Sequence, residues 1–138
     1  MAESIMLDKA KDFAVEIVNL CRNIKETKRE SVLTNQLLRS GTSIGANIHE
    51  SKYGHGTADF IAKMQIALKE CYESEYWLEL LNRTGYIPDE QYKSSSHLRP
   101  PMRWRLSYNH FTRSAQYFTW DRVNTRRGHA RRTSSSSA

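Results

Sequence analysis

Three charged residues in the middle of the chain have a spacing that could bring them together. Arg39 lies before His55, and Glu70 and Glu73 lie after it. If the chain reverses near His55, antiparallel pairing of the flanking segments places position 39 opposite about position 71. A guanidinium group that faces two carboxylates can make charge-assisted, bidentate hydrogen bonds. Such a cluster could bind a polar ligand, but an ion pair that fixes the register of two helices is the favoured interpretation.

Small and polar residues surround Arg39 on the same segment. Gly41 and Gly45 have the Gly-x-x-x-Gly spacing, which in a membrane helix would suggest dimerisation, but the charged flanks exclude a membrane span. We therefore expect close packing between soluble helices or between protomers, which would offset the roughly 1 kcal/mol that each glycine costs in a helix. Ser40, Ser43 and Asn47 lie on nearby turns and could form hydrogen bonds across the same interface or with their own backbone.

No set of residues has the pattern of a catalytic or metal site. A di-iron bundle enzyme needs Glu-x-x-His on two helices, and no glutamate here has a histidine three positions later. His49, Glu50 and His55 are close in sequence but are expected at the surface rather than on a metal. The segment 54–56 lacks the third glycine of a dinucleotide-binding loop and follows a helical pattern rather than a strand. The sequence therefore predicts no enzyme activity, no cofactor, no metal and no small-molecule substrate.

Hydrophobic residues at three- and four-residue steps predict the three helices that must position these groups. The first covers residues 8–25, the second starts near 27–31 and ends before Gly54, and the third runs from residue 57 to a stop at Gly85. A fourth helix should begin at Pro88, but the serines and prolines that follow would stop it. The predicted fold class is an all-α, up-down antiparallel bundle with three clear helices and the fourth truncated or replaced by an irregular basic tail.

The helix ends are predicted from capping residues. Thr27 and Glu30 have capping-box spacing, with Ser31 as an alternative N-cap of the second helix. Thr57 is expected to cap the third helix, and Gly85 is expected to end it.

The charge changes sign after Tyr92. Residues 1–92 contain 11 Lys and Arg and 14 Asp and Glu, a net charge of −3, whereas residues 93–138 contain 10 Lys and Arg and a single acid, a net charge of +9. We therefore predict a helical bundle domain at 1–93 and an Arg- and Ser-rich, largely irregular or disordered tail at 94–138. Within this tail, residues 102–108 alternate as in a strand, although no partner strand is visible.

Arginines are interleaved with aromatic residues in the tail. Guanidinium groups bind phosphates and aromatic rings stack on bases, so the tail could bind single-stranded RNA or DNA. The candidate nucleic-acid contacts are Arg103, Trp104, Arg105, Arg113, Arg126 and Arg127. The favoured interpretation is an unselected extension that binds RNA in a salt-dependent way without a biological task.

Several features predict a cytoplasmic protein with no membrane contact. No stretch approaches the roughly 18–20 uncharged apolar residues of a membrane span, and the first nine residues carry charge where a signal peptide has its hydrophobic core. Cys21 and Cys71 lie far apart in helical segments, which favours two structural thiols in a reducing compartment.

The middle of the chain resembles a known family. The run 36–50, which contains Arg-Ser-Gly-Thr-Ser-Ile-Gly-Ala-Asn-Ile, and the segments 59–61, 66–70 and 73–78 are similar to the bacterial four-helix-bundle proteins encoded in 23S rRNA intervening sequences. The resemblance covers roughly residues 7–93. It implies an up-down four-helix bundle that assembles into a homopentameric ring or barrel, with no established enzymatic activity. The helix-interface and motif residues are Arg39, Ser40, Gly41, Ser43, Ile44, Gly45, Asn47, Glu50, Phe60, Glu70, Glu73 and Trp77.

A related branch of this family acts in diversity-generating retroelements. Its accessory proteins bind nucleic acid and a reverse transcriptase through a basic surface, but the acidic body of this chain argues against the same binding. The predicted function is therefore a non-catalytic, self-assembling bundle. The alternative is a nucleic-acid-binding accessory protein that uses the Arg- and aromatic-rich tail or a basic ring surface.

The chain departs from the family after Lys93, where the relatives continue into an amphipathic fourth helix. The abrupt switch to Arg, Ser and Pro suggests a reading-frame change in the gene or in its recorded sequence. Residues 100–104 can be encoded by codons whose shifted frame gives Ala-Asp-Glu-Val, a helix-compatible segment. Sequencing the gene tests this hypothesis, which fails if neither alternative frame encodes an apolar helical repeat after codon 93.

Overall fold

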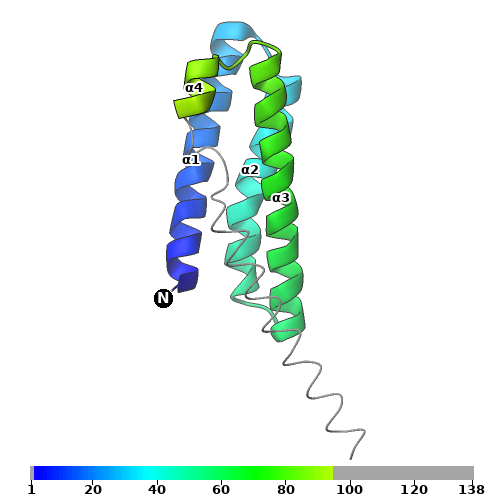
Figure 1. Ribbon diagram of the computed structural model, residues 1–138. Helices are drawn as coiled ribbons and strands as arrows, with labels where there is room; N and C mark the ends of the chain where they lie inside the picture. Colours follow the sequence, from blue (N-terminus) through cyan, green and yellow to red (C-terminus); the bar gives the residue numbers. More distant parts are fainter. Residues whose placement is uncertain (1, 95–138) are drawn as a thin grey trace, which may run out of the picture.

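The computed structural model describes residues 2–94, in which helices are joined by short turns and there is no strand (Figure 1). The helices are α1 (Ala2–Lys28), α2 (Val32–Ser51), α3 (Thr57–Arg83) and the short α4 (Asp89–Ser94). Helix α1 packs on α2, α2 packs on α3, and α4 returns from the end of α3. The predicted all-α antiparallel bundle with three long helices is confirmed. The strand predicted at 102–108 and the predicted irregular tail lie outside the described residues.

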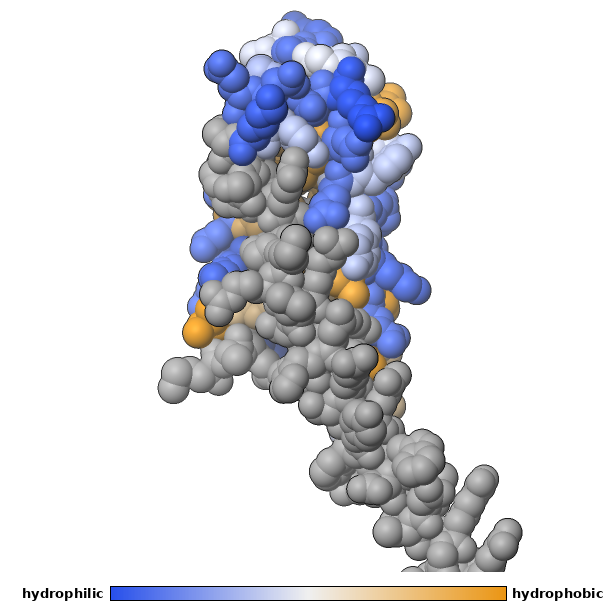
Figure 2. Space-filling model, in the orientation of Figure 1, coloured by the Kyte–Doolittle hydropathy of each residue, from blue (hydrophilic) through white to orange (hydrophobic). Residues whose placement is uncertain are grey.

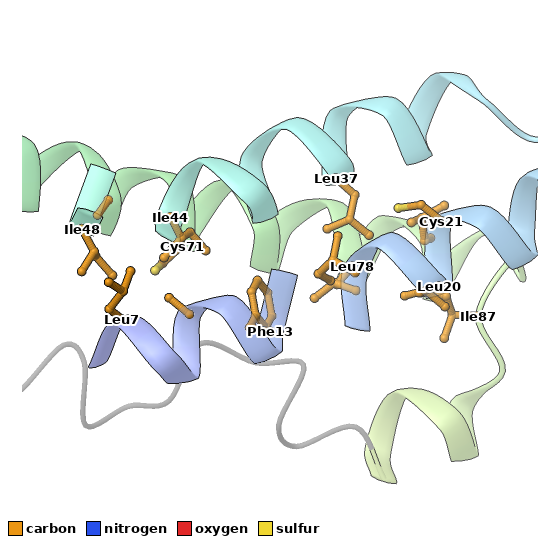
Figure 3. Packing of buried hydrophobic residues seen from close by; sticks show 14 of the residues in the cluster. Leu7, Phe13, Leu20, Cys21, Leu37, Ile44, Ile48, Cys71, Leu78 and Ile87 are labelled. Carbon is orange, nitrogen blue, oxygen red and sulfur yellow. The ribbon is translucent and has the colours of Figure 1, made fainter. Parts of the chain in front are cut away.

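The hydrophobic stripes of the three long helices meet in one core (Figure 3). Ile17 of α1, Ile44 of α2 and Leu78 of α3 are almost completely buried. Full burial of a side chain of this size stabilises the folded state by roughly 1.5–3 kcal/mol, so the stripes hold the bundle together. The buried hydrophobic residues of the core are Leu7, Ala10, Phe13, Ile17, Leu20, Cys21, Ile24, Leu37, Ile44, Ile48, Met64, Ala67, Cys71, Leu78, Leu81 and Ile87.

Helix α1 starts six residues before the predicted position. Leu7 is buried and Met6 packs against the core, so the apolar stripe continues toward the N-terminus by about one turn. The sequence prediction began at Asp8 because it counted only the regular repeat after that residue.

The turn between α1 and α2 is closed by Glu30 rather than by the predicted capping residues. The Glu30 carboxylate accepts hydrogen bonds from the N–H groups of Leu33 (2.7 Å) and Thr34 (2.9 Å). Thr27 lies inside α1 and donates to the backbone of its own helix, so the predicted capping box is wrong. Ser31 holds the N-cap position, but its side chain makes no cap hydrogen bond. The longer glutamate side chain satisfies the free N–H groups at the start of α2 from one position earlier.

We expect the Glu30→Ala variant to lose about 1–2 kcal/mol of unfolding free energy near neutral pH, because two N–H groups lose their cap. Burial raises the pKa of Glu30, but the hydrogen bonds from Leu33 and Thr34 outweigh burial and leave the pKa below its ordinary value. A lowered folded-state pKa means that this stabilisation is complete above the unfolded-state pKa and is lost as the pH falls through the folded-state pKa. Urea unfolding of both proteins across acidic pH should therefore show the difference shrinking on acidification. A difference that is constant with pH would contradict the assignment.

The two ends of α3 are fixed by turn geometry. Gly56, not the predicted Thr57, is the N-cap, and Thr57 is the first helical residue. The Asp59 carboxylate accepts a hydrogen bond from the N–H of His55 (3.2 Å) and tightens the turn before the helix. At the other end Gly85 has a φ of 80°, the left-handed conformation that glycine adopts without strain, and ends the helix as predicted.

Candidate functional site

The largest charged cluster predicted from the sequence lies on the α2–α3 interface. Arg39 projects from α2, and its Nη1 lies 3.5 Å from Oε2 of Glu70 on α3. Its Nη2 donates to Oε1 of Glu73, one turn further along α3. Trp77 Nε1–H donates to the same Glu73 oxygen at 3.1 Å. The antiparallel pairing thus places Arg39 between the two carboxylates, with Trp77 holding the second.

Electrostatics in this cluster favour the ionised pair. The hydrogen bond from Arg39 lowers the pKa of Glu73, and the hydrogen bond from Trp77 lowers it further. The Arg39 side chain is 51% exposed, whereas the side chains of Glu70 and Glu73 are 17% and 34% exposed. Solvent screening therefore limits how much the cluster stabilises the fold. One guanidinium group faces two carboxyl groups, so the cluster is a small ion-pair network that aligns α2 with α3.

A double-mutant cycle on Arg39→Gln and Glu73→Gln should give a coupling free energy of only about 0.2–1 kcal/mol, the range of exposed ion pairs. The measurement is urea unfolding of the parent, both single variants and the double variant. The matched pair Glu50 and Lys63, which also joins α2 to α3, is the control. A coupling several times larger for Arg39 than for the control would mean that the cluster does more than fix register.

A buried hydroxyl pair lies next to the charged cluster. Ser40 on α2 and Ser74 on α3 are both fully buried, and their Oγ atoms are 2.9 Å apart. The backbone carbonyl oxygens of Leu37 and Glu70 lie 3.3 Å from Ser40 Oγ and 2.8 Å from Ser74 Oγ, so the two hydroxyl protons are shared among these carbonyls and the contact between the two serines. Ser40 therefore forms a hydrogen bond across the helix interface, one of the two possibilities left open by the sequence.

Asn47 instead forms a hydrogen bond with the backbone of its own helix. Its Nδ2 donates to the carbonyl oxygen of Ser43 in the same helix at 2.9 Å. Both residues are half-buried. Of the three polar residues considered, Ser40 is therefore the one that the structure places in a bond to another helix.

The two glycines of α2 face α1 within the same chain. A Cβ atom added to Gly41 would lie 3.0 Å from Cγ2 of Ile17, and one added to Gly45 would lie 3.6 Å from Cβ of Ala10. The Gly-x-x-x-Gly spacing thus lets α1 approach α2 closely, with Gly41 at the tighter of the two contacts. Ile44, between the glycines, is fully buried in the core.

The remaining motif residues also make contacts between or along the helices. Glu50 is exposed and pairs with Lys63 of α3, and Phe60 is half-buried against the core. Trp77 is half-buried and makes an edge-to-face contact with Tyr76, with ring centroids 4.9 Å apart. The candidate nucleic-acid contacts from Arg103 to Arg127 lie outside the described residues.

Cys21 is held as an unreactive thiol between α1 and α2. Its Sγ donates to the carbonyl oxygen of Thr34 at 3.4 Å. Burial raises the pKa of the Cys21 thiol to about 11, against a smaller lowering by Lys25. A thiol with this pKa is protonated at neutral pH and is a weak nucleophile. Cys71 is buried as well, and neither cysteine forms a disulfide bond.

Within residues 2–94 no group of three or more His, Cys, Asp or Glu side chains could hold a metal ion. None of the helices in this part of the chain is both long and apolar enough to cross a membrane.

Glu30 has a clear structural role that the sequence prediction missed, because the prediction placed this residue in a different capping pattern. Its position directly before Ser31 and a hydrophobic repeat is the signal that could have identified it.

Comparison with known proteins finds a family model and similar solved structures. A family model described as 23S rRNA-intervening sequence protein matches residues 2–99. The crystal structure of a protein of unknown function from the S23 ribosomal protein family of Bacteroides thetaiotaomicron VPI-5482 is similar, with 46% sequence identity and a TM-score of 0.69. The similarity covers 83% of this chain and 96% of the other. No curated protein matches the chain.

Proposed function

The chain belongs to the 23S rRNA-intervening sequence protein family, and on this premise we propose that it is a non-catalytic helical bundle that self-assembles into a homopentameric ring. The charged groups of the α2–α3 interface support a structural rather than a catalytic task, because Arg39, Glu73 and Trp77 bind one another. The absence of a disulfide bond between the two cysteines supports a location in the cytoplasm.

The observation that carries this proposal is the position of the exposed hydrophobic side chains. Ile66 (41% exposed) and Tyr76 (58%) lie on α3, and Ile5 (55%) and Val15 (60%) lie on α1. Helices α1 and α3 each pack on α2 (Figure 1), so these exposed residues form two separate surfaces that belong to different helices. Figure 2 shows that hydrophobic patches interrupt an otherwise mostly hydrophilic surface. Two unlike surfaces on one protomer favour head-to-tail contacts, which close into a ring when the rotation between neighbours allows it.

Light scattering of the full chain during size-exclusion chromatography tests the proposal. We expect a mass five times the 16.1 kDa of one chain, and a one-chain mass for the Tyr76→Lys and Val15→Lys variants. Val32→Lys is the matched control, since Val32 is 73% exposed but lies on α2. A parent protein that elutes as a monomer, or as a polydisperse aggregate, would contradict the proposal. Equal disruption by the control would also count against it.

The second candidate function is nucleic-acid binding by the basic part of the chain, favoured by the net charge of +9 in residues 93–138. We expect the full chain to bind single-stranded RNA with an affinity that falls steeply with salt. Replacing Arg103 and Arg105 with serine should weaken this binding and flatten its salt dependence, whereas replacing Lys52 and Lys69 should not. RNA binding that is equal in both double variants would contradict this candidate.

A further inference from the structure

Two adjacent aromatic rings of α3 lie at the edge of the charged cluster. Tyr76 is 58% exposed and belongs to the surface that the proposed function assigns to a contact between protomers, whereas Trp77 is half-buried. The two rings meet edge to face, with their centroids 4.9 Å apart. Tyrosine and tryptophan are among the residue types that most often dominate the binding energy of protein interfaces. The orientation of these two rings therefore decides what this surface offers to a neighbouring chain.

The indole ring of Trp77 is held from the α2 side by a series of hydrogen bonds. Its Nε1–H donates to Oε1 of Glu73 at 3.1 Å, and Nη2 of Arg39 donates to the same oxygen. An indole ring has a single N–H donor, so this bond fixes the orientation of the ring as well as its position. Arg39, Glu73, Trp77 and Tyr76 thus form one connected series from α2 to the exposed surface of α3, which we call the Arg39–Tyr76 network.

Glu70 offers Arg39 a second carboxylate that lies close by. Oε2 of Glu70 is buried 3.5 Å from Nη1 of Arg39, and no donor among the described residues forms a hydrogen bond with it. If Glu73 were removed, the guanidinium group could move this short distance and remain paired with a carboxylate. Trp77 would still lose the acceptor that holds its ring. The specific contribution of Glu73 is therefore the orientation of Trp77 rather than the charge balance of Arg39.

The Arg39–Tyr76 network is better suited to ordering side chains than to stabilising the fold. The side chain of Arg39 is 51% exposed, and ion pairs with this exposure contribute little to stability. Ordering has a separate benefit, because a side chain that is already fixed in the free protomer loses no further conformational entropy on association. Aromatic rings, which have few rotatable bonds, then present a large and rigid contact area.

We propose that Arg39 and Glu73 are positioning residues of the self-assembly surface: they hold Trp77, and through its ring Tyr76, in the orientation that a neighbouring copy of the chain contacts. This inference rests on the proposed function, because it names what prepares one of the two surfaces for that contact. Arg39 and Trp77 lower the pKa of Glu73, so the carboxylate that accepts both hydrogen bonds is ionised at neutral pH. The charged cluster thereby has a task beyond the register of α2 and α3.

Light scattering on dilution of the full chain tests the proposal by giving the assembly midpoint, the concentration at which half of the chains are assembled. We expect Glu73→Ala to raise this concentration by about tenfold, since two aromatic side chains must then be ordered during association. Glu73→Gln should assemble almost as the parent does, because its amide oxygen still accepts from Trp77. The matched control Glu50→Ala breaks the contact of α2 with Lys63 of α3 and should leave the midpoint unchanged.

A double-mutant cycle separates the orientation of the ring from the charge of Glu73. Trp77→Phe keeps an aromatic ring but removes the N–H, so it should raise the assembly midpoint as well. In the Trp77→Phe protein, Glu73→Ala should have almost no further effect. The background W104F/W120F leaves Trp77 as the sole tryptophan and gives an independent measurement at concentrations where every variant has the one-chain mass. There, acrylamide should quench Trp77 fluorescence more strongly after Glu73→Ala than after Glu73→Gln.

Three results with an assembling parent would overturn this inference and leave the proposed function intact. The first is an assembly midpoint of Glu73→Ala equal to that of the parent, with only the free energy of unfolding reduced. The second is an additive effect of Glu73→Ala and Trp77→Phe, which would mean that the carboxylate acts without the ring. The third is quenching of Trp77 that Glu73→Ala does not change.

Two further outcomes are also decisive. If Glu73→Ala does not fold, Trp77→Phe alone decides: a raised midpoint supports the inference, and a midpoint equal to that of the parent overturns it. A parent chain that keeps the one-chain mass at every concentration would overturn the proposed function together with this inference.

Discussion

Replacing Leu37 with alanine should lower the free energy of unfolding by about 2–5 kcal/mol, the largest effect we expect from a single substitution in this chain. Leu37 is completely buried in the N-terminal half of α2. Alanine removes its apolar contacts and leaves a cavity that rigid helices on both sides cannot close. Because the free energy of unfolding of a domain of this size is only about 5–15 kcal/mol, the variant should lose a large share of its stability.

Urea unfolding followed by far-UV circular dichroism measures this effect. The matched control is Val32→Ala in the same helix, where the side chain is 73% exposed and the expected change is within about 0.5 kcal/mol. A Leu37→Ala protein as stable as the Val32→Ala protein would mean that the stripe of α2 does not face the core.

The second large effect is expected at Gly41. Leucine there should destabilise the fold by about 1–3 kcal/mol, even though it improves helix propensity by about 1 kcal/mol, because α1 leaves no room for it. A Cβ atom alone would lie 3.0 Å from Cγ2 and 3.2 Å from Cγ1 of Ile17. The larger side chain must push α1 away from α2 or force Ile17 out of its rotamer.

Gly45 provides the comparison for Gly41, since both occupy the same face of α2. The atoms nearest to an added Cβ at Gly45 belong to Ala10 and lie at 3.6–3.7 Å, which is ordinary contact. Gly45→Ala should therefore stabilise the protein by up to about 1 kcal/mol. Thermal unfolding of the two variants measures whether each substitution stabilises or destabilises the protein. A destabilised Gly45→Ala, or a Gly41→Leu as stable as the parent, would show that the α1–α2 spacing differs from that described.

The sequence was sufficient for the larger features of the fold. Hydrophobic periodicity located the three long helices, and the left-handed position of Gly85 ended α3 where the sequence predicted. Simple antiparallel counting about His55 placed position 39 near position 71, and Arg39 contacts Glu70 and Glu73. These predictions succeed because helix geometry is regular, so one turn position fixes the register of two straight helices.

Local contacts that depend on side-chain reach could not be predicted in the same way. Thr27 with Glu30 matched a capping pattern, yet Glu30 caps α2 because its longer carboxylate reaches the N–H groups of Leu33 and Thr34. Several residues near a helix end can compete for the same free N–H groups. Which residue caps the helix depends on where the preceding turn ends. Hydrophobic periodicity does not resolve this position to within one or two residues.

The sequence by itself determined that this chain forms antiparallel helices with apolar stripes, because the period of the hydrophobic residues matches the turn of a helix. Only the tertiary structure decided which residues the small and polar residues of α2 contact. Gly41 could have packed against another protomer, and Ser40 could have bonded to its own helix alone, but they face Ile17 and Ser74. The physical reason is that residue type and spacing define a face of a helix, whereas the rotation and separation of packed helices define what that face touches.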